Sequence, residues 1–327
     1  YELSYNPFHE AITAFEDYIY AYPNSVSSNE AYEFLLQVYM KSKNYEKALA
    51  SLDKIENKDT RTKEAYQIVA FNRGVELFRG GSYDSALTFF EKVNEFPVNN
   101  ALTAEALFWK GEIAYMKKQY TKCVALYNSF LQQPGSYNSD LYILGNYGLG
   151  YAQFKQEKYP LAISAFRTYI DSDRSKTDKQ LNDAYLRVGD CYYVAKDYSP
   201  AINYYDKAIG MNEANKDYAL YQKAICYELN EQPNKAIGIL NKLLNEQIGS
   251  KFTVDTKSEL GKIYLSMDRY SDAKQHFLKI IDEHPTSLHV KYALRDLCLI
   301  YVKERNTDKV LEIWNTIKTQ YPNDKVA

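Results

Sequence analysis

The sequence predicts an all-α fold, a solenoid built from antiparallel helix pairs, and three observations support this prediction. First, the 327 residues include 33 Tyr but only 13 Gly and 9 Pro, a composition that favours helices packed through aromatic rings. Second, a small residue recurs at intervals of 35 to 39 residues along the whole chain. Third, apolar residues within each interval are spaced three and four apart, the spacing of one face of an α-helix.

The recurring small residue is used here as an anchor that aligns the intervals. The nine anchors are Ala11, Ala48, Ala86, Cys123, Ala162, Ala201, Ala236, Ala273 and Val310. Four residues after each anchor stands a large apolar or aromatic residue, such as Phe90, Tyr127 or Phe166, which predicts a buried stripe on the second helix of each pair. Stacked units of similar length predict one domain over residues 1–327, with a first unit that is truncated.

Two further positions recur in register with the anchor. Three residues before it, seven of nine intervals carry an aromatic ring, Phe8 among them, and the exceptions are Pro233 and Thr307. Twelve residues before it, seven of eight intervals carry a small residue, and the exception is Leu36. The small residues are Gly74, Gly111, Gly150, Gly189, Ala224, Gly261 and Cys298. A small residue there lets the first helix approach the second closely, and the aromatic ring fills the remaining space.

Short polar turns, such as residues 117–119, join the two helices of each pair. Residues that can cap a helix N-terminus precede several second helices, namely Asn44, Ser82, Asp197 and Asn306. We expect their side chains to accept hydrogen bonds from the first free amides of those helices. The connectors between pairs, at residues 24–29, 135–140, 172–178 and 212–215, are polar and predict loops.

The pattern Leu149-Gly150, Tyr159, Ala162 and Phe166 in residues 144–170 recurs in residues 182–209 and 257–281. It resembles the pattern of the tetratricopeptide repeat (TPR) family, and the resemblance covers essentially the whole chain. The resemblance implies a right-handed superhelical α-solenoid of about eight to nine helix-turn-helix units, whose first helices line a concave groove. The intervals exceed the family's usual length of about 34 residues, so the extra residues are expected between units.

Charge and motifs exclude several classes of function. Lys and Arg total 40 against 42 Asp and Glu, a net charge of −2, which argues against a nucleic-acid binder. No apolar run approaches the roughly 18–20 residues that a transmembrane helix needs. No phosphate-binding loop, nucleophile elbow or zinc-protease helix motif occurs in the sequence. We therefore predict a protein that is not an enzyme and uses no cofactor and no metal.

The cysteines and histidines predict packing and surface roles. Cys123, Cys191, Cys226 and Cys298 stand at small-residue positions of the repeat, where free Cys behaves as a small apolar residue. Three of the four histidines, His276, His284 and His289, lie close together in sequence but lack the spacing of metal ligands. We expect them to be surface histidines.

The resemblance leaves the groove as the candidate working surface. In the family, positions 15 and 11 before the anchor commonly face the groove, and position eight before it adds to the same surface. Carried over to this chain, they imply a partner-binding groove of Phe71, Phe108, Tyr115, Tyr147, Tyr151, Phe154, Tyr193 and Tyr221. Aromatic rings give large contact areas and often dominate binding energy. The alternative is that some of these rings pack between neighbouring first helices.

Three functions remain open. The first is a non-catalytic scaffold that binds a peptide or helix of a partner protein in the groove and could oligomerise through its ends. The second is binding of a glycan or envelope polymer by the same aromatic residues. The third is a sensor or assembly module of a larger protein. The Tyr-Pro-x-Ser motif at residues 22–25 and the Tyr/Asn/Lys-rich composition are similar to TPR proteins of the bacterial envelope, of Bacteroides type. That similarity implies a periplasmic or envelope location, with the cytoplasm as the alternative.

Overall fold

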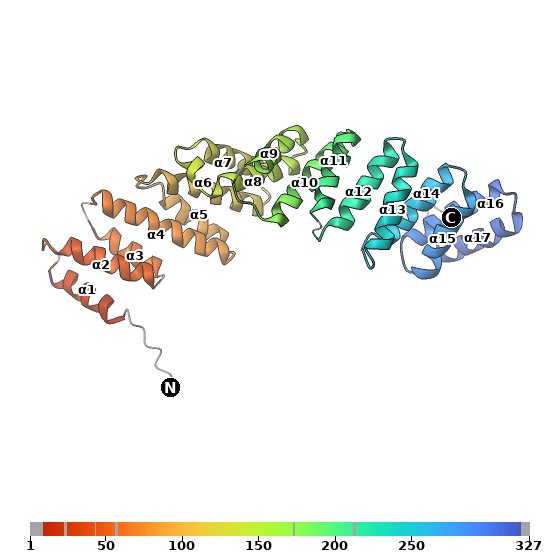
Figure 1. The fold of residues 1–327 in the computed structure, drawn as a ribbon. Helices are drawn as coiled ribbons and strands as arrows, with labels where there is room; N and C mark the ends of the chain where they lie inside the picture. The colour runs from red at the N-terminus through yellow and green to blue at the C-terminus, as the bar shows by residue number, and fades with distance from the viewer. Residues whose placement is uncertain are drawn as a thin grey trace. The chain divides into compact units, whose positions relative to one another are not determined.

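The computed structural model describes residues 9–22, 25–42, 44–55, 58–172, 174–211 and 214–321. These residues form 17 α-helices and one short 3-10 helix, with no strand among them (Figure 1), so the predicted all-α fold is confirmed. Phe8 and the Pro23-Asn24 step of the Tyr-Pro-x-Ser motif lie outside the described residues. The chain divides into two compact units, residues 1–174 (unit 1) and 175–327 (unit 2). The single domain over 1–327 stays a prediction.

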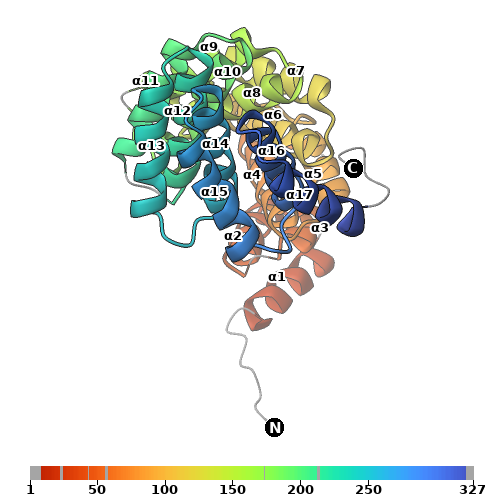
Figure 2. The ribbon, with the colours of Figure 1, turned by 90° about the vertical axis from the view of Figure 1, so that its right-hand side faces the viewer.

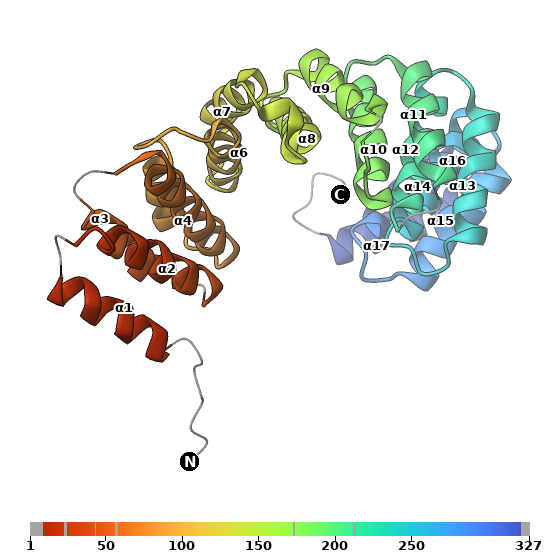
Figure 3. The ribbon, with the colours of Figure 1, turned by 60° about the vertical axis from the view of Figure 1, so that its left-hand side comes forward.

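Unit 1 contains one helix followed by four helix pairs, which Figure 3 shows in succession along the chain. The helices are α1 (His9–Ala21), α2 (Ser28–Lys41), α3 (Tyr45–Asp53), α4 (Thr60–Arg79), α5 (Tyr83–Lys92), α6 (Asn100–Met116), α7 (Tyr120–Gln132), α8 (Leu141–Lys155) and α9 (Tyr159–Asp171). The 3-10 helix (Ser136–Asn138) lies in the connector between α7 and α8. Each second helix contacts both its partner and the first helix of the next pair within the unit.

Unit 2 contains four further pairs. They are α10 (Asp178–Val194) with α11 (Tyr198–Gly210), α12 (Lys216–Leu229) with α13 (Pro233–Glu246), α14 (Thr253–Ser266) with α15 (Tyr270–Glu283), and α16 (His289–Lys303) with α17 (Thr307–Gln320). Figure 2 shows α11 and α13 on the outer side of α12 and α14, and α13 contacts both α12 and α14. The pairs therefore keep the predicted order, in which a first helix always alternates with a second helix.

The anchors lie where the repeat places them. From Ala48 to Ala273, each anchor sits in the second helix of its pair and has no exposed surface, whereas Val310 in the last pair is half-buried. Four residues further along, the same helices carry some of the largest fully buried side chains in the described chain. These are Phe90, Tyr127, Phe166, Tyr205 and Phe277.

The small residue of the first helix faces this large ring in the same pair. A Cβ atom added at Gly150 would lie 2.8 Å from the ring of Phe166, and one added at Gly261 would lie 2.5 Å from the ring of Phe277. The same contact joins Gly74 to Phe90, Gly111 to Tyr127 and Gly189 to Tyr205. The predicted close approach is confirmed, because a ring lies against bare backbone that any side chain would displace.

In the seven pairs from α4–α5 to α16–α17, the turn inside the pair is closed by the backbone. Gly81 and six other residues have positive φ angles there, 77° for the glycine and 57–61° for Lys118, Glu157, Lys196, Glu231, Asp268 and Arg305. The next amide then donates to a carbonyl five residues back, as Gln119 N does to Ala114 O at 2.8 Å. This is the Schellman arrangement, which satisfies the last carbonyls of the first helix.

The predicted side-chain caps are therefore mostly wrong. Asn44, Ser82 and Asp197 make no side-chain cap hydrogen bond, because the backbone bonds of the turn already fix the chain at these points. Asn306 is the exception and confirms the prediction, since its Oδ1 accepts from the amide of Lys309 at 3.1 Å.

Candidate functional site

The predicted groove residues lie on the first helices of both units. In unit 1, α4 contacts α6 and α6 contacts α8, so corresponding positions on these helices share one face of the unit. The residues are Phe71 on α4, Phe108 and Tyr115 on α6, and Tyr147, Tyr151 and Phe154 on α8. In unit 2, Tyr193 lies on α10 and Tyr221 on α12.

Three tyrosines of unit 1 form a continuous run of ring contacts across two first helices. The ring of Tyr151 lies 5.2 Å from that of Tyr147, one turn earlier on α8, and 6.3 Å from that of Tyr115 on α6. Both contacts are edge-to-face, with interplanar angles of 75° and 77°. All three side chains are half-buried. The three rings therefore border a shared strip of partly exposed aromatic surface, to which we refer as the tyrosine strip.

Aromatic residues eight positions before the anchor also have a structural role. Tyr115 packs on Tyr120 at 5.7 Å, and Phe154 packs on Tyr159 at 5.7 Å, each across the turn of its own pair. Tyr193 makes the same contact with its own turn residue at 6.3 Å in unit 2. The packing and the binding interpretations of these rings are thus compatible, because each ring contacts the turn and still keeps part of its surface exposed.

Phe71 and Phe108 differ from the other predicted groove residues. The ring of Phe71 is half-buried and lies 5.9 Å from the core ring of Phe90. Phe108 is only 4% exposed and packs against Trp109 and Phe130 at ring distances of 5.5 and 5.6 Å. Its side chain belongs to the core of unit 1, so we leave Phe108 out of the surface proposed below.

In unit 2, the first helices combine phenols with carboxylates. Tyr221 stacks on Phe252 at 5.3 Å, and burial raises the pKa of its hydroxyl. Burial also raises the pKa of Tyr193, and the nearby Glu259 and Glu228 add to the effect. Burial, followed by the charge of Glu259, raises the pKa of Glu228. Both phenols are therefore uncharged near neutral pH.

Two carboxyl groups on first helices, the half-buried Glu112 and the buried Asp190, were missed by the sequence reasoning. Glu112 accepts a short hydrogen bond from the hydroxyl of Tyr127 in the same pair. Asp190 accepts from Tyr205 Oη at 2.8 Å and from Arg187 Nη1 at 2.6 Å. Burial raises the pKa of both carboxyl groups, and the charge of Arg187 opposes this at Asp190. The signal in the sequence is the Tyr four residues after the anchor, since a buried hydroxyl there needs an acceptor.

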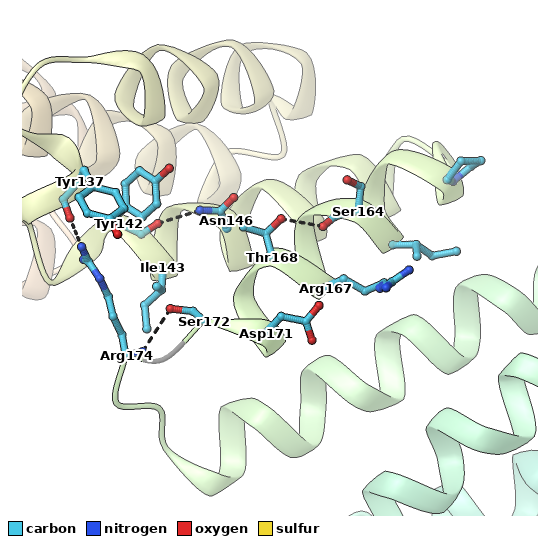
Figure 4. A pocket seen from close by; sticks show the side chains of 12 residues that line it. Tyr137, Tyr142, Ile143, Asn146, Ser164, Arg167, Thr168, Asp171, Ser172 and Arg174 are labelled. Atoms are coloured by element: carbon cyan, nitrogen blue, oxygen red, sulfur yellow. Dashed lines mark hydrogen bonds between the residues drawn. The ribbon is translucent and has the colours of Figure 1, made fainter.

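A cavity of about 830 Å³ opens elsewhere on unit 1, beside α8 and α9 (Figure 4). Tyr137 and Tyr142 stand at one end with their rings 5.2 Å apart, and the guanidinium of Arg174 lies over both at 4.9 and 5.4 Å. Arg167 and Asp171, from α9, line another part of it. The sequence reasoning missed this cavity because Tyr137 and Arg174 lie in connectors, outside the repeated positions.

Comparison with known proteins identifies the repeat. One tetratricopeptide repeat model matches residues 147–219, and a second matches residues 105–136, 218–247 and 259–287. The chain belongs to the tetratricopeptide repeat family. A TPR repeat-containing protein of Methanocaldococcus jannaschii is 21% identical over 255 residues, which are 75% of this chain and 41% of that protein, so this chain spans less than half of the relative's length. The C-terminal part of a TPR repeat-containing protein from Cytophaga hutchinsonii matches with a TM-score of 0.63 at 19% identity, over 78% of this chain and 96% of that chain.

The cysteines of this TPR chain pack inside the helix pairs. Cys123, Cys191 and Cys226 are buried, Cys298 is half-buried, and all four are free thiols. Burial raises the pKa of the first three thiols to about 12. These three are protonated near neutral pH, as expected for residues that act as small apolar side chains.

The histidines are less exposed than we predicted for surface residues. His276 stacks on Tyr264 at 5.6 Å, and burial lowers the pKa of its ring. His289 lies half-buried with Nε2 3.2 Å from a carboxylate oxygen of Asp255. Among the described residues, no group of three or more His, Cys, Asp or Glu could hold a metal ion. Within the same part of the chain, every helix is too short or too polar to span a bilayer.

Proposed function

We propose that this TPR chain is a non-catalytic interaction scaffold that binds a peptide or helix of a partner protein on the aromatic face of its first helices. The observation that carries the proposal is the tyrosine strip, in which Tyr115, Tyr147 and Tyr151 join two successive first helices through ring contacts. The membership of the TPR family supports it, since stacked repeats offer extended surfaces for binding.

The chemistry of the strip suits a peptide ligand. Each ring is held in place by packing against its neighbours, so binding orders few additional side-chain torsions. The partly exposed rings supply apolar area, and tyrosine is enriched among residues that dominate binding energy. A partner segment with apolar side chains spaced along a helix or an extended strand could contact successive rings.

The environments of several carboxyl and thiol groups within the helix pairs support the non-catalytic part of the proposal. Glu112 and Asp190 already accept hydrogen bonds from core tyrosines. The thiols of Cys123, Cys191 and Cys226 have pKa values raised to about 12. Buried thiols with raised pKa values are poor nucleophiles at neutral pH, and both carboxyl groups are already engaged by hydrogen bonds within the fold.

The proposal extends to the location of the protein in the bacterial envelope, which rests on the composition and the Tyr-Pro-x-Ser motif alone. Fractionation of cells that carry the chain in its native context tests it. Recovery in the periplasmic or membrane-associated fraction supports the location, and recovery in the cytoplasmic fraction contradicts it. Oligomers formed through the ends of the chain would appear as a concentration-dependent mass in sedimentation.

The binding proposal is tested with peptides selected against the wild-type chain from a random displayed library. We expect Tyr115→Ala and Tyr151→Ala each to weaken binding of the selected peptides by at least about tenfold, measured by fluorescence polarisation. Tyr151→Phe keeps the ring and should retain most of the affinity. The matched control is Tyr204→Ala, which removes a half-buried ring from the second helix α11. Equal affinities for the wild type and both alanine variants, each shown to be folded, would exclude the tyrosine strip as the binding surface.

A further inference from the structure

The cavity beside α8 and α9 is a second candidate site, separate from the tyrosine strip. We propose that it binds an acidic sugar, that is, a saccharide ring that carries a carboxylate. The proposal goes beyond the scaffold function, because the lining of the cavity includes none of the tyrosines that form the strip. It rests on four features, namely size, a fixed aromatic platform, a free guanidinium group and neighbouring hydroxyl groups.

The size and rigidity of the cavity suit a small ligand. Its volume is about 830 Å³, within the range of roughly 300–1,000 Å³ typical of small-molecule sites. Internal hydrogen bonds hold its walls. Arg174 donates from Nη1 to the carbonyl oxygen of Ser139 at 2.5 Å, and its amide donates to Ser172 Oγ at 3.2 Å. Asn146 Nδ2 donates to the carbonyl oxygen of Tyr142 at 3.1 Å. The site is thus largely formed before a ligand arrives.

Tyr137 supplies a platform for a sugar ring. Its side chain is 68% exposed, which is unusual for a large ring in this chain. The ring is nevertheless held in place, because Tyr142 meets it at 67° and the guanidinium of Arg174 lies 4.9 Å from its centre. The apolar C–H face of a pyranose ring can cover such a ring and remove it from water. Figure 4 shows both tyrosines and Arg174 at the same end of the cavity.

The charges of the lining favour an anionic ligand. Among the described residues, Arg167 has no ion-pair or hydrogen-bond partner, and its side chain is exposed. The lining as described contains two guanidinium groups, of Arg167 and Arg174, and one carboxylate, of Asp171. Arg174 is engaged with carbonyl oxygens, so Arg167 is the group that can present two parallel N–H donors to a ligand carboxylate.

Hydroxyl and carboxylate groups near Arg167 favour a sugar over an aromatic acid. Ser164, Thr168 and Asp171 lie on α9, are exposed and line the cavity. Thr168 Oγ1 donates to the carbonyl oxygen of Ser164 at 3.0 Å, which leaves its lone pairs free to accept. The hydroxyl groups of a sugar can bond with all three side chains. An aromatic acid would displace water from them without replacing its hydrogen bonds.

Calorimetric or ligand-detected NMR titration of the full chain tests the ligand class. The probes are sodium D-glucuronate, its uncharged counterpart D-glucose, and sodium benzoate as an aromatic acid. We expect D-glucuronate to bind in the millimolar range and at least about tenfold more tightly than either other probe. Glucose that binds as tightly as glucuronate would overturn the role of Arg167. If benzoate binds more tightly than glucuronate, the ligand class of the cavity is an aromatic acid and the proposal of an acidic sugar is wrong. The absence of binding by all three probes at about 50 mM would refute the site.

Two pairs of variants test the residues. Arg167→Gln and Tyr137→Ala should each weaken glucuronate binding by about tenfold or more. The matched controls are Arg79→Gln and Tyr20→Ala, which change an exposed arginine and an exposed tyrosine outside the cavity and should bind as the wild type does. All four positions are exposed, so thermal unfolding should be unchanged and loss of binding can be separated from loss of fold. Selected peptides should still bind Arg167→Gln at the tyrosine strip, so failure of the sugar site leaves the scaffold function standing.

Discussion

From Phe90 to Tyr205, phenylalanine and tyrosine alternate at the position four residues after the anchor. Which of the two stands there determines whether the pair must supply a hydrogen-bond acceptor. Tyr127 and Tyr205 bring a hydroxyl group into the core, and each finds a carboxyl group on the first helix of its own pair, Glu112 or Asp190. The pairs with Phe at this position have Val75, Tyr151 or Lys262 where the acid stands. A buried hydroxyl without an acceptor costs about 1–3 kcal/mol, so the acid and the Tyr belong together.

The half-buried carboxyl of Glu112 should make stability depend on pH. Burial raises its pKa above the ordinary value of 4.5, and the hydrogen bond from Tyr127 only partly opposes this. Between 4.5 and the raised value, the folded chain binds the proton more tightly than the unfolded chain does, so the free energy of unfolding falls as pH rises through that window. Glu112→Gln keeps an acceptor for Tyr127 and removes this titration. Urea unfolding from pH 4 to 8 should show that the free energy of unfolding of the variant increases relative to that of the wild type as pH rises. Glu91→Gln, at an exposed site, is the control, and equal pH slopes for all three proteins would contradict the assignment.

We expect a Gly→Ala substitution to lower the free energy of unfolding at a first-helix glycine and to raise it at an exposed glycine. Gly150→Ala places a Cβ 2.8 Å from the ring of Phe166, and we expect a loss of about 1–3 kcal/mol in the free energy of unfolding. Gly238→Ala, on an exposed helix position with nothing within 4 Å, should gain about 0.5–1 kcal/mol from helix propensity alone. Chemical denaturation measures both, and Gly150→Ala/Phe166→Leu should recover part of the loss. A higher free energy of unfolding for both alanine variants would show that the ring of Phe166 leaves room for a side chain at Gly150.

At the scale of the element, the seven helix pairs from α4–α5 to α16–α17 are each closed by one residue with a left-handed backbone. Six of these residues carry side chains, at φ of 57–61°, although glycine adopts this conformation more readily. The bonds that follow, such as Lys158 N to Gln153 O at 3.0 Å, hold the conformation in place. The short polar turn therefore sets the antiparallel pairing, and side-chain capping contributes little.

Adjacent glycines in the turn between α4 and α5 provide a test. Gly81 has a φ of 77°, and a Cβ atom added to it would have nothing within 4 Å, so Gly81→Ala should cost about 1–2 kcal/mol through backbone strain alone. Gly80, the residue before it, has a φ of −79°, and Gly80→Ala should be neutral or slightly stabilising. Thermal unfolding of the two variants makes the comparison. If Gly80→Ala lowers stability as much as Gly81→Ala does, then steric crowding, and not the left-handed backbone of Gly81, determines the loss of stability.

At the scale of the molecule, each unit has hydrophobic clusters of its own. One cluster of unit 1 surrounds Phe90 and another surrounds Tyr127, while those of unit 2 surround Tyr205 and Phe277. Repeat arrays draw their stability from contacts between neighbouring repeats, so a set of four pairs can support itself. The division of the chain into residues 1–174 and 175–327 is consistent with such self-supporting sets.

Fragments test this independence. We expect fragments 1–174 and 175–327, expressed separately, to be helical by circular dichroism and to unfold cooperatively. Fragment 1–158 lacks α9 and hence the Phe166 ring that covers Gly150, so it should unfold about 10 °C lower than fragment 1–174. A fragment 175–327 that is unfolded alone would show that the two units need each other. A shared, single transition in the full chain would then support the predicted single domain.

The helix pairs could be predicted from the sequence alone, because a pattern repeated nine times reports the packing of each small residue against its ring, as Gly150 and Phe166 illustrate. The placement of the tyrosine strip on the first helices was equally predictable, since register positions on a helix follow from its periodicity. Other features emerged only from the folded chain. In the folded chain Phe108 is buried, backbone turns replace the expected side-chain caps except that of Asn306, and Tyr137 contacts Arg174, 37 residues away in sequence. These features depend on which groups meet in space across different elements. The contact of Tyr137 with Arg174 also joins residues outside the repeated positions, so it leaves no periodic trace in the chain.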